Sequence, residues 1–194
     1  MTKSRIEAFS DGVIAVIITI LVLEMKVPHG ASPEALAPLV PVFLSYVLSF
    51  VFIGIYWNNH HHLLHAVHHV DGSVMWANLH LLFWLSLVPF VTAWMGENHF
   101  APLPVAAYGL VLLGAAMAYT VLVRALLRIH GKDSTLTRAL GKDFKGHVSI
   151  VIYLVAVAMT FVHPWISCAL YALVAALWLC PDPRIEKLLG SDPA

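Results

Sequence analysis

Charged residues are scarce in this sequence. Only 11% of its 194 residues are Asp, Glu, Lys or Arg, whereas 60% are hydrophobic. Soluble domains carry about 25% charged residues, and a chain this poor in charge cannot cover a water-facing surface. The formal net charge is zero, so the total gives no basis for nucleic-acid binding. The composition therefore predicts an integral protein of a lipid bilayer.

Cysteine is also scarce, and both copies, Cys168 and Cys180, fall inside one apolar segment. Twelve residues of helix span about 18 Å, which is beyond the reach of a disulfide bond. We interpret the two cysteines as small hydrophobic residues of a helix.

Six apolar segments follow one another along the chain: 6–25, 38–60, 74–96, 102–127, 147–162 and 165–181. Most of them approach the ~20 residues that cross a hydrocarbon core. Pro164 separates the last two, because proline disfavours the α conformation of the residue before it, and Pro89 is expected to kink the third segment. The sequence thus predicts one all-α domain, 1–194, with six transmembrane helices and a basic loop at about 129–146 that has room for a short helix.

Lysine and arginine are distributed unevenly between the loops. If the N terminus is cytoplasmic, ten of the eleven basic residues face the cytoplasm and only Lys26 lies outside. This arrangement follows the positive-inside rule. It predicts a multi-pass protein of the cell membrane with both termini in the cytoplasm.

The first segment is unusual, because its uninterrupted apolar run, 12–23, is short and has charged residues at both ends. Helical spacing places Gly12, Val16, Thr19 and Leu23 on one stripe. If copies of this helix surround an axis, bulky apolar rings can gate a pore by dewetting, and a Thr19 ring can replace hydration oxygens of an ion. The alternative is an ordinary packing face, with Thr19 bonded back to a carbonyl of its own helix.

Polar residues of the first three segments are expected at one depth near the cytoplasmic boundary. They are Arg5, Ser10, Asp11, Trp57, His60, His61 and Asn78. Polar groups need partners in a medium of low dielectric constant, and a pair of Arg5 with Asp11, bridged by imidazole or amide, would supply them. The cluster is interpreted as a tie between the three helices, with direct ion binding as the alternative.

The second segment ends in a histidine cluster: His60, His61, His62, His65, His68 and His69. His61, His65 and His68 share a helical face, and imidazoles so spaced can chelate zinc. Only Asp71 could complete such a set, so no metal site and no cofactor are predicted. The cluster leaves open a proton- or metal-coupled transporter, because histidine titrates near pH 6.5. No nucleophile is paired with a base, so an enzyme is not expected.

The N-terminal half carries three motifs that together resemble a known family. The first, R-x-x-x-F-S-D-x-x-x-A-x-x-x-T-x-L-x-L-E, consists of Arg5, Phe9, Ser10, Asp11, Ala15, Thr19, Leu21, Leu23 and Glu24. Tyr56-Trp57-x-x-His60-His61 in the second segment is similar to a companion motif of that family. In the third segment the match runs from Asn78-Leu79 to Pro89-Phe90-x-Thr92. Over residues 5–97 the chain resembles the prokaryotic branch of the transmembrane protein 175 family.

The resemblance implies a homotetrameric potassium-permeable channel without a T-V-G-Y-G filter, with the first helices around the pore and possible passage of other monovalent cations. It places Val16 in the inner hydrophobic ring, Thr19 in the hydroxyl ring and Leu23 in the outer hydrophobic ring. Family members often have isoleucine or leucine at the first ring, so Val16 makes it smaller. A network of Arg5, Asp11 and His60 or His61 is implied to hold the pore helix, and one six-helix unit is typical of bacterial members.

Overall fold

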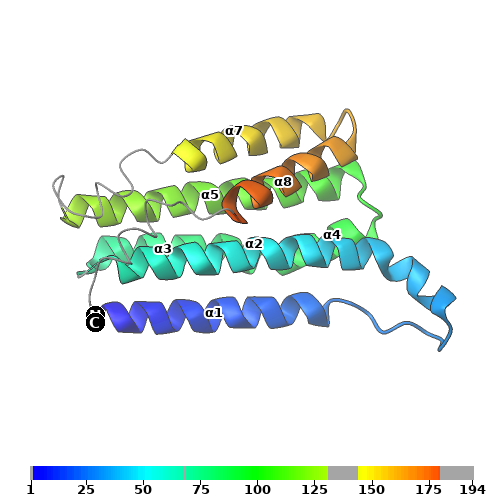
Figure 1. Ribbon diagram of the computed structural model, residues 1–194, viewed down its shortest axis with the longest axis horizontal. Coiled ribbons are helices and arrows are strands. Elements are labelled where there is room, and N and C mark those ends of the chain that lie inside the picture. Colours follow the sequence, from blue (N-terminus) through cyan, green and yellow to red (C-terminus); the bar gives the residue numbers. More distant parts are fainter. Residues whose placement is uncertain (1, 68, 131–143, 180–194) are drawn as a thin grey trace.

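The computed structural model describes residues 2–67, 69–130 and 144–179, and every regular element in these ranges is a helix (Figure 1). The elements are α1 (Lys3–Leu23), the 3₁₀ helix η1 (Pro33–Leu39), α2 (Val40–His65), α3 (Gly72–Ser86), α4 (Val88–Glu97), α5 (Pro102–His130), α7 (Phe144–Met159) and α8 (Pro164–Leu179). The prediction of an all-α protein with six transmembrane helices is confirmed, with α3 and α4 together forming the third.

Four of these six are long and apolar enough to cross a bilayer: α1, η1 with α2, α3 with α4, and α5. The last two, α7 and α8, have 16 residues each, which is about 24 Å of helix. The basic loop predicted at 129–146 falls mostly on 131–143, outside the described residues.

Prolines interrupt the helices where the sequence predicts it. The third transmembrane helix is broken at Leu87, between α3 and α4, two residues before Pro89. Proline has no amide hydrogen, so the Leu85 carbonyl loses its helical donor there. Pro164 is the first residue of α8. The Ser167 hydroxyl of α8 links this helix to α7 by donating to the Ala156 carbonyl at 2.7 Å.

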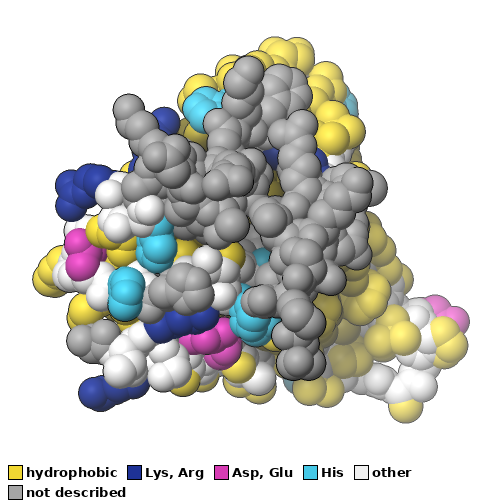
Figure 2. Space-filling model, turned by 60° about the vertical axis from the view of Figure 1, so that its left-hand side comes forward, with side chains coloured by type: hydrophobic (Ala, Val, Ile, Leu, Met, Phe, Trp, Pro, Cys, Tyr) yellow, Lys and Arg dark blue, Asp and Glu magenta, His cyan; other side chains and the backbone are white. Residues whose placement is uncertain are grey.

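The helices lie side by side, with α1 at one edge of the bundle and α7 at the opposite edge (Figure 1). Lys3 Nζ donates to the His65 carbonyl at 3.0 Å, so the start of α1 meets the end of α2. At the other end of the molecule, Lys26 Nζ lies 2.6 Å from Glu97 Oε1. Figure 2 shows Lys, Arg and His side chains gathered at the end where α1 begins, with hydrophobic side chains along the flanks.

Candidate functional site

The first helix has one buried face and one exposed face. The buried face consists of Ile6, Ser10, Ile14, Ile17 and Leu21, which pack against α2, α3 and α4. Gly12, Val16, Thr19 and Leu23 lie on the opposite side and are all exposed, Val16 at 55% and Leu23 at 76%. The four residues predicted to line a pore therefore share a face that this chain leaves uncovered.

The hydroxyl of Thr19 is bonded within its own helix. Its Oγ1 donates to the Val16 carbonyl at 2.8 Å, one turn earlier. This is the bond expected of an ordinary helix face. It also uses the hydroxyl hydrogen, so that the exposed oxygen can only accept, or coordinate a cation, on its outward side.

A buried hydrogen-bonded chain joins α1, α2 and α3. The Asn78 amide nitrogen donates to Ser10 Oγ at 2.9 Å, and Ser10 Oγ donates to the Ile6 carbonyl at 2.8 Å. His60 Nε2 lies 2.7 Å from Asn78 Oδ1. All three side chains are buried.

The direction of these bonds fixes the tautomer of His60. Because the nitrogen of Asn78 donates to Ser10, its oxygen must accept, and the hydrogen of the imidazole sits on Nε2. His60 Nδ1 is buried without a hydrogen-bond partner among the described residues. The chain thus joins three helices through buried polar side chains.

A second, more exposed group of contacts lies beside this chain. Trp57 Nε1 donates to Asp11 Oδ1 at 3.1 Å, and Trp57 stacks on the ring of His61, with centroids 6.2 Å apart. His61 Nδ1 lies 3.3 Å from Glu7 Oε1. The predicted residues Asp11, Trp57 and His61 are therefore brought together, but in contacts separate from the buried chain.

Arg5 and Asp11, which were expected to be bridged by imidazole or amide, are not brought together in the described structure. Arg5 is exposed, and it makes no side-chain hydrogen bond or ion pair with any of the described residues. The physical reason is helical geometry, because six residues of helix turn through about 600°, so Arg5 and Asp11 point about 120° apart. Arg5 instead shares the outward stripe of Gly12 and Val16.

The histidine cluster does not form a metal site in the part of the chain that is described. No group of three or more His, Cys, Asp or Glu side chains there could hold a metal ion. The rings of His61 and His65 lie 6.1 Å apart. His68, the third member of the predicted face, lies outside the described residues.

Two contacts of this region were not predicted from the sequence. Glu7 pairs with His61, and Lys3 binds the C-terminal carbonyl of α2 at His65. A signal was present for Glu7, since it lies one turn before Asp11 and on the same side of α1. For Lys3 no such signal exists, because its partner is a backbone oxygen 62 residues away.

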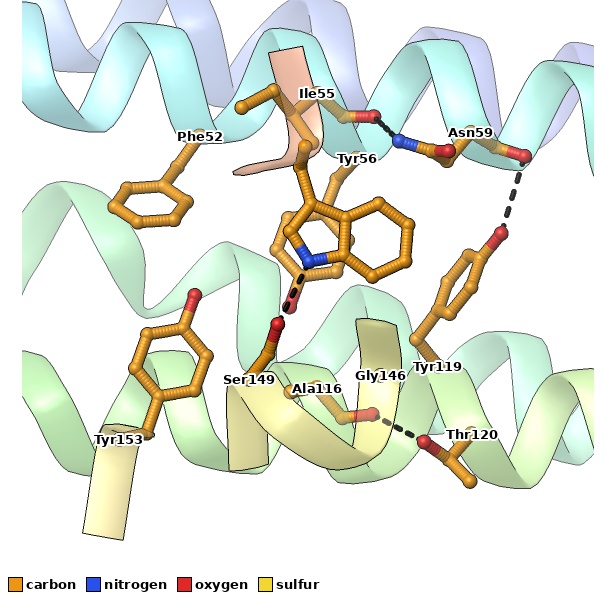
Figure 3. A pocket seen from close by; sticks show the side chains of 11 residues that line it. Phe52, Ile55, Tyr56, Asn59, Ala116, Tyr119, Thr120, Gly146, Ser149 and Tyr153 are labelled. Atoms are coloured by element: carbon orange, nitrogen blue, oxygen red, sulfur yellow. Dashed lines mark hydrogen bonds between the residues drawn. The ribbon is translucent and has the colours of Figure 1, made fainter. Parts of the chain in front are cut away.

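A cavity of about 30 Å³ lies among α2, α5, α7 and α8, away from α1 (Figure 3). Aromatic side chains dominate its lining, among them Tyr56, Tyr119, Tyr153 and Trp178. Trp178 Nε1 donates to Ser149 Oγ at 2.8 Å beside it. Because no residue of α1 lines this cavity, it offers no passage along the exposed stripe.

Comparison with known proteins identifies the family. The sequence-family model described as endosomal/lysosomal potassium channel TMEM175 matches residues 5–89. A potassium channel of Chryseobacterium sp. is 54% identical over 192 residues, which cover 99% of this chain and 100% of that protein. A potassium channel of Chamaesiphon minutus is 33% identical over 195 residues, 89% of this chain and 93% of its own.

A solved structure agrees with these sequence matches. The crystal structure of a lysosomal potassium-selective channel TMEM175 homolog from Chamaesiphon minutus is similar with a TM-score of 0.79 and 30% identity. The similarity covers 91% of this chain and 96% of that one. Each of these relatives is named a channel, and the first is related over its full length. This multi-pass membrane protein therefore belongs to the TMEM175 family of potassium channels.

Proposed function

We propose that this protein is a potassium-preferring channel of the bacterial cell membrane, in which four copies of α1 surround the pore. Its relatives are named potassium channels, which supports K⁺ as the permeant ion. The observation that carries the proposal is the exposed stripe of α1, with Val16, Thr19 and Leu23 turned away from the rest of their own chain. The sequence contains no T-V-G-Y-G filter.

Assembly is a physical requirement of this proposal. The cavity of the single chain has no α1 lining, and one Thr19 hydroxyl offers an ion a single oxygen. Closed cyclic symmetry places identical side chains at one level, so four copies supply four Thr19 oxygens between apolar rings of Val16 and Leu23. A hydroxyl ring can replace part of the hydration shell of K⁺, and the apolar rings restrict passage by dewetting.

The polar contacts behind α1 have a supporting role in this account. Ser10 is bound to Asn78, and Asn78 to His60, so the helix that lines the pore is held at a fixed rotation against α2 and α3. A helix whose rotation is fixed keeps its hydroxyl ring aimed at the axis, which is a condition for selectivity.

The competing function is a proton- or metal-coupled transporter that uses the histidines of α2. It predicts saturable flux that is lost when His61 and His65 are replaced by Gln, whereas a channel keeps conducting. Currents of purified protein in planar bilayers, with K⁺ on one side and Na⁺ on the other, separate the two. Adding a pH gradient reveals whether protons carry part of the current.

Thiol modification tests the pore face directly. In a background with Cys168→Ala and Cys180→Ala, Leu23→Cys is expected to be blocked by a charged methanethiosulfonate reagent added from the side of the α1–α2 loop. Phe161→Cys is the matched control, because Phe161 is 69% exposed in the turn after α7, and α7 lies at the opposite edge of the bundle from α1 (Figure 1). Modification of Leu23→Cys without loss of current would refute the proposed pore face.

A further inference from the structure

The outer face of α5 carries an apolar stripe that ends in two arginines. Leu110, Met117 and Val121 are exposed, and Arg124 and Arg128 are exposed as well. Their spacing of seven, four, three and four residues keeps all five within about 60° on the helix. The face therefore changes from apolar to cationic along a single line.

Contacts of two glycines place this stripe between α3 and α7. Gly114 of α5 packs against the indole of Trp84 in α3, and Gly109 packs against Tyr171 in α8 and Val157 in α7. Relative to Met117 the two glycines point to opposite sides, at about 60° and 80°. The stripe thus faces outward, with α3 on one flank and α7 on the other.

The arginines lie at the depth of an exposed tryptophan. Gly114 of α5 contacts the indole of Trp84 in α3. The two helices run in opposite directions (Figure 1), so Trp76, eight residues before Trp84, lies within one turn of the level of Arg124. Trp76 is 75% exposed, and exposed tryptophans of membrane proteins concentrate at the level of the lipid headgroups.

Neither guanidinium makes a hydrogen bond or ion pair with any residue in the described ranges. Arg124 and Arg128 are one helical turn apart, close enough for both to reach one phosphate. Guanidinium groups match the oxygens of a phosphate in geometry and charge. Basic sites between transmembrane helices on the cytoplasmic side are suited to anionic lipid headgroups.

We propose that this face of α5 binds an anionic phospholipid of the leaflet at the end where α5 terminates. The lipid phosphate lies between Arg124 and Arg128, Trp76 lies at headgroup level, and an acyl chain follows Val121, Met117 and Leu110. A zwitterionic lipid brings the same phosphate together with a cationic group, so the arginines favour phosphatidylglycerol over phosphatidylcholine.

Native mass spectrometry of the purified full-length protein, titrated with each of these two lipids, tests the proposal. Phosphatidylglycerol is expected to bind about 30-fold more tightly, since two arginines near the headgroups, at about 1 kcal/mol each, together contribute about 2 kcal/mol. The double variant Arg124→Gln/Arg128→Gln should lose this preference, and Arg124→Lys/Arg128→Lys should retain part of it. The oligomer mass in the same spectra reports whether each variant has assembled.

The double variant Arg184→Gln/Lys187→Gln is the matched control, because it removes two positive charges from the C-terminal segment instead. It is expected to keep the full preference. Equal binding of the two lipids by the unmodified protein would overturn the proposal. A control that loses the preference for phosphatidylglycerol as much as Arg124→Gln/Arg128→Gln does would overturn it too. Displacement of phosphatidylglycerol by inorganic phosphate would overturn it as well, because the site would then recognise a free anion.

Discussion

His60 Nε2 lies 2.7 Å from Asn78 Oδ1, and both side chains are buried where α2 meets α3. Replacing Asn78 with Leu removes a donor and an acceptor and leaves Ser10 Oγ and His60 Nε2 without their partner. A buried polar group without a partner costs about 1–3 kcal/mol, so Asn78→Leu is expected to lower the unfolding temperature clearly. Asn98→Leu is the control for thermal unfolding in detergent, because Asn98 is exposed at the other end of the molecule. Among the described residues, its side chain donates a hydrogen bond only to the Trp94 carbonyl.

Gly114 allows α3 and α5 to approach closely. A Cβ at this position would overlap the indole ring of Trp84, whereas a Cβ at Gly54 would meet no atom within 4 Å. Gly114→Ala is therefore expected to destabilise the protein by about 1–3 kcal/mol through overpacking. Gly54→Ala should be neutral or stabilising, since alanine favours helix over glycine. Equal unfolding temperatures of the two variants would contradict the close packing of Gly114 on Trp84.

The fold could be predicted because its main signals are local. Long apolar runs indicate membrane spans, Pro164 separates the last two helices, and basic residues mark one end of the bundle. These signals do not depend on which helix lies next to which. The break near Pro89 could be placed for the same reason, since the missing amide hydrogen is a property of that residue alone.

The polar contacts of α1 could be predicted only in part, because partners depend on helix rotation and register. Asn78, Ser10 and His60 were expected at one depth, and the structure joins them. Arg5 was expected to meet Asp11 through a bridging imidazole or amide, but the two side chains point about 120° apart on the same helix. Its side chain is exposed as a result. The depth of a residue in the membrane can be counted along the sequence. Which neighbouring helix its side chain points toward is known only from the tertiary structure.

Asp71 caps the N terminus of α3, which gives a prediction about pH. The hydrogen bond from Ser73, followed by that from the Val74 amide, lowers the pKa of Asp71 from its ordinary value of 3.8. A lowered pKa in the folded state stabilises the protein above the unfolded-state pKa, and the contribution is lost as the pH falls through the folded-state value. Asp71→Asn keeps an acceptor for the cap but cannot ionise. We expect the unmodified protein to be more stable than Asp71→Asn at neutral pH, and the difference to shrink below about pH 4. A difference in unfolding temperature that does not depend on pH would contradict this account.

Lys26 and Glu97 form an exposed ion pair, with 79% and 45% of their side chains accessible. Their hydrogen bond raises the pKa of Lys26 above its ordinary value of 10.5. The contribution of the pair to stability is therefore present at neutral pH and is lost as the pH rises through the raised folded-state pKa. Exposed pairs contribute little and are screened by salt. A double-mutant cycle of Lys26→Gln and Glu97→Gln should give a small coupling at low salt and none at about 1 M salt, where the Debye length is about 3 Å. A large coupling that persists at high salt would mean that the pair is shielded from solvent.

The most direct test of the central claim, that the exposed stripe of α1 contacts the permeating ions, is the reversal potential of Thr19 variants under a K⁺/Na⁺ gradient. Thr19→Ala removes the hydroxyl oxygen, whereas Thr19→Ser keeps it and serves as the matched control. A hydrogen-bond-like contact to a charged group is worth about 1.5–3 kcal/mol, so Thr19→Ala should reduce the K⁺/Na⁺ permeability ratio on the order of tenfold, and Thr19→Ser should preserve it. An unchanged reversal potential in Thr19→Ala would contradict the claim that Thr19 lines the pore.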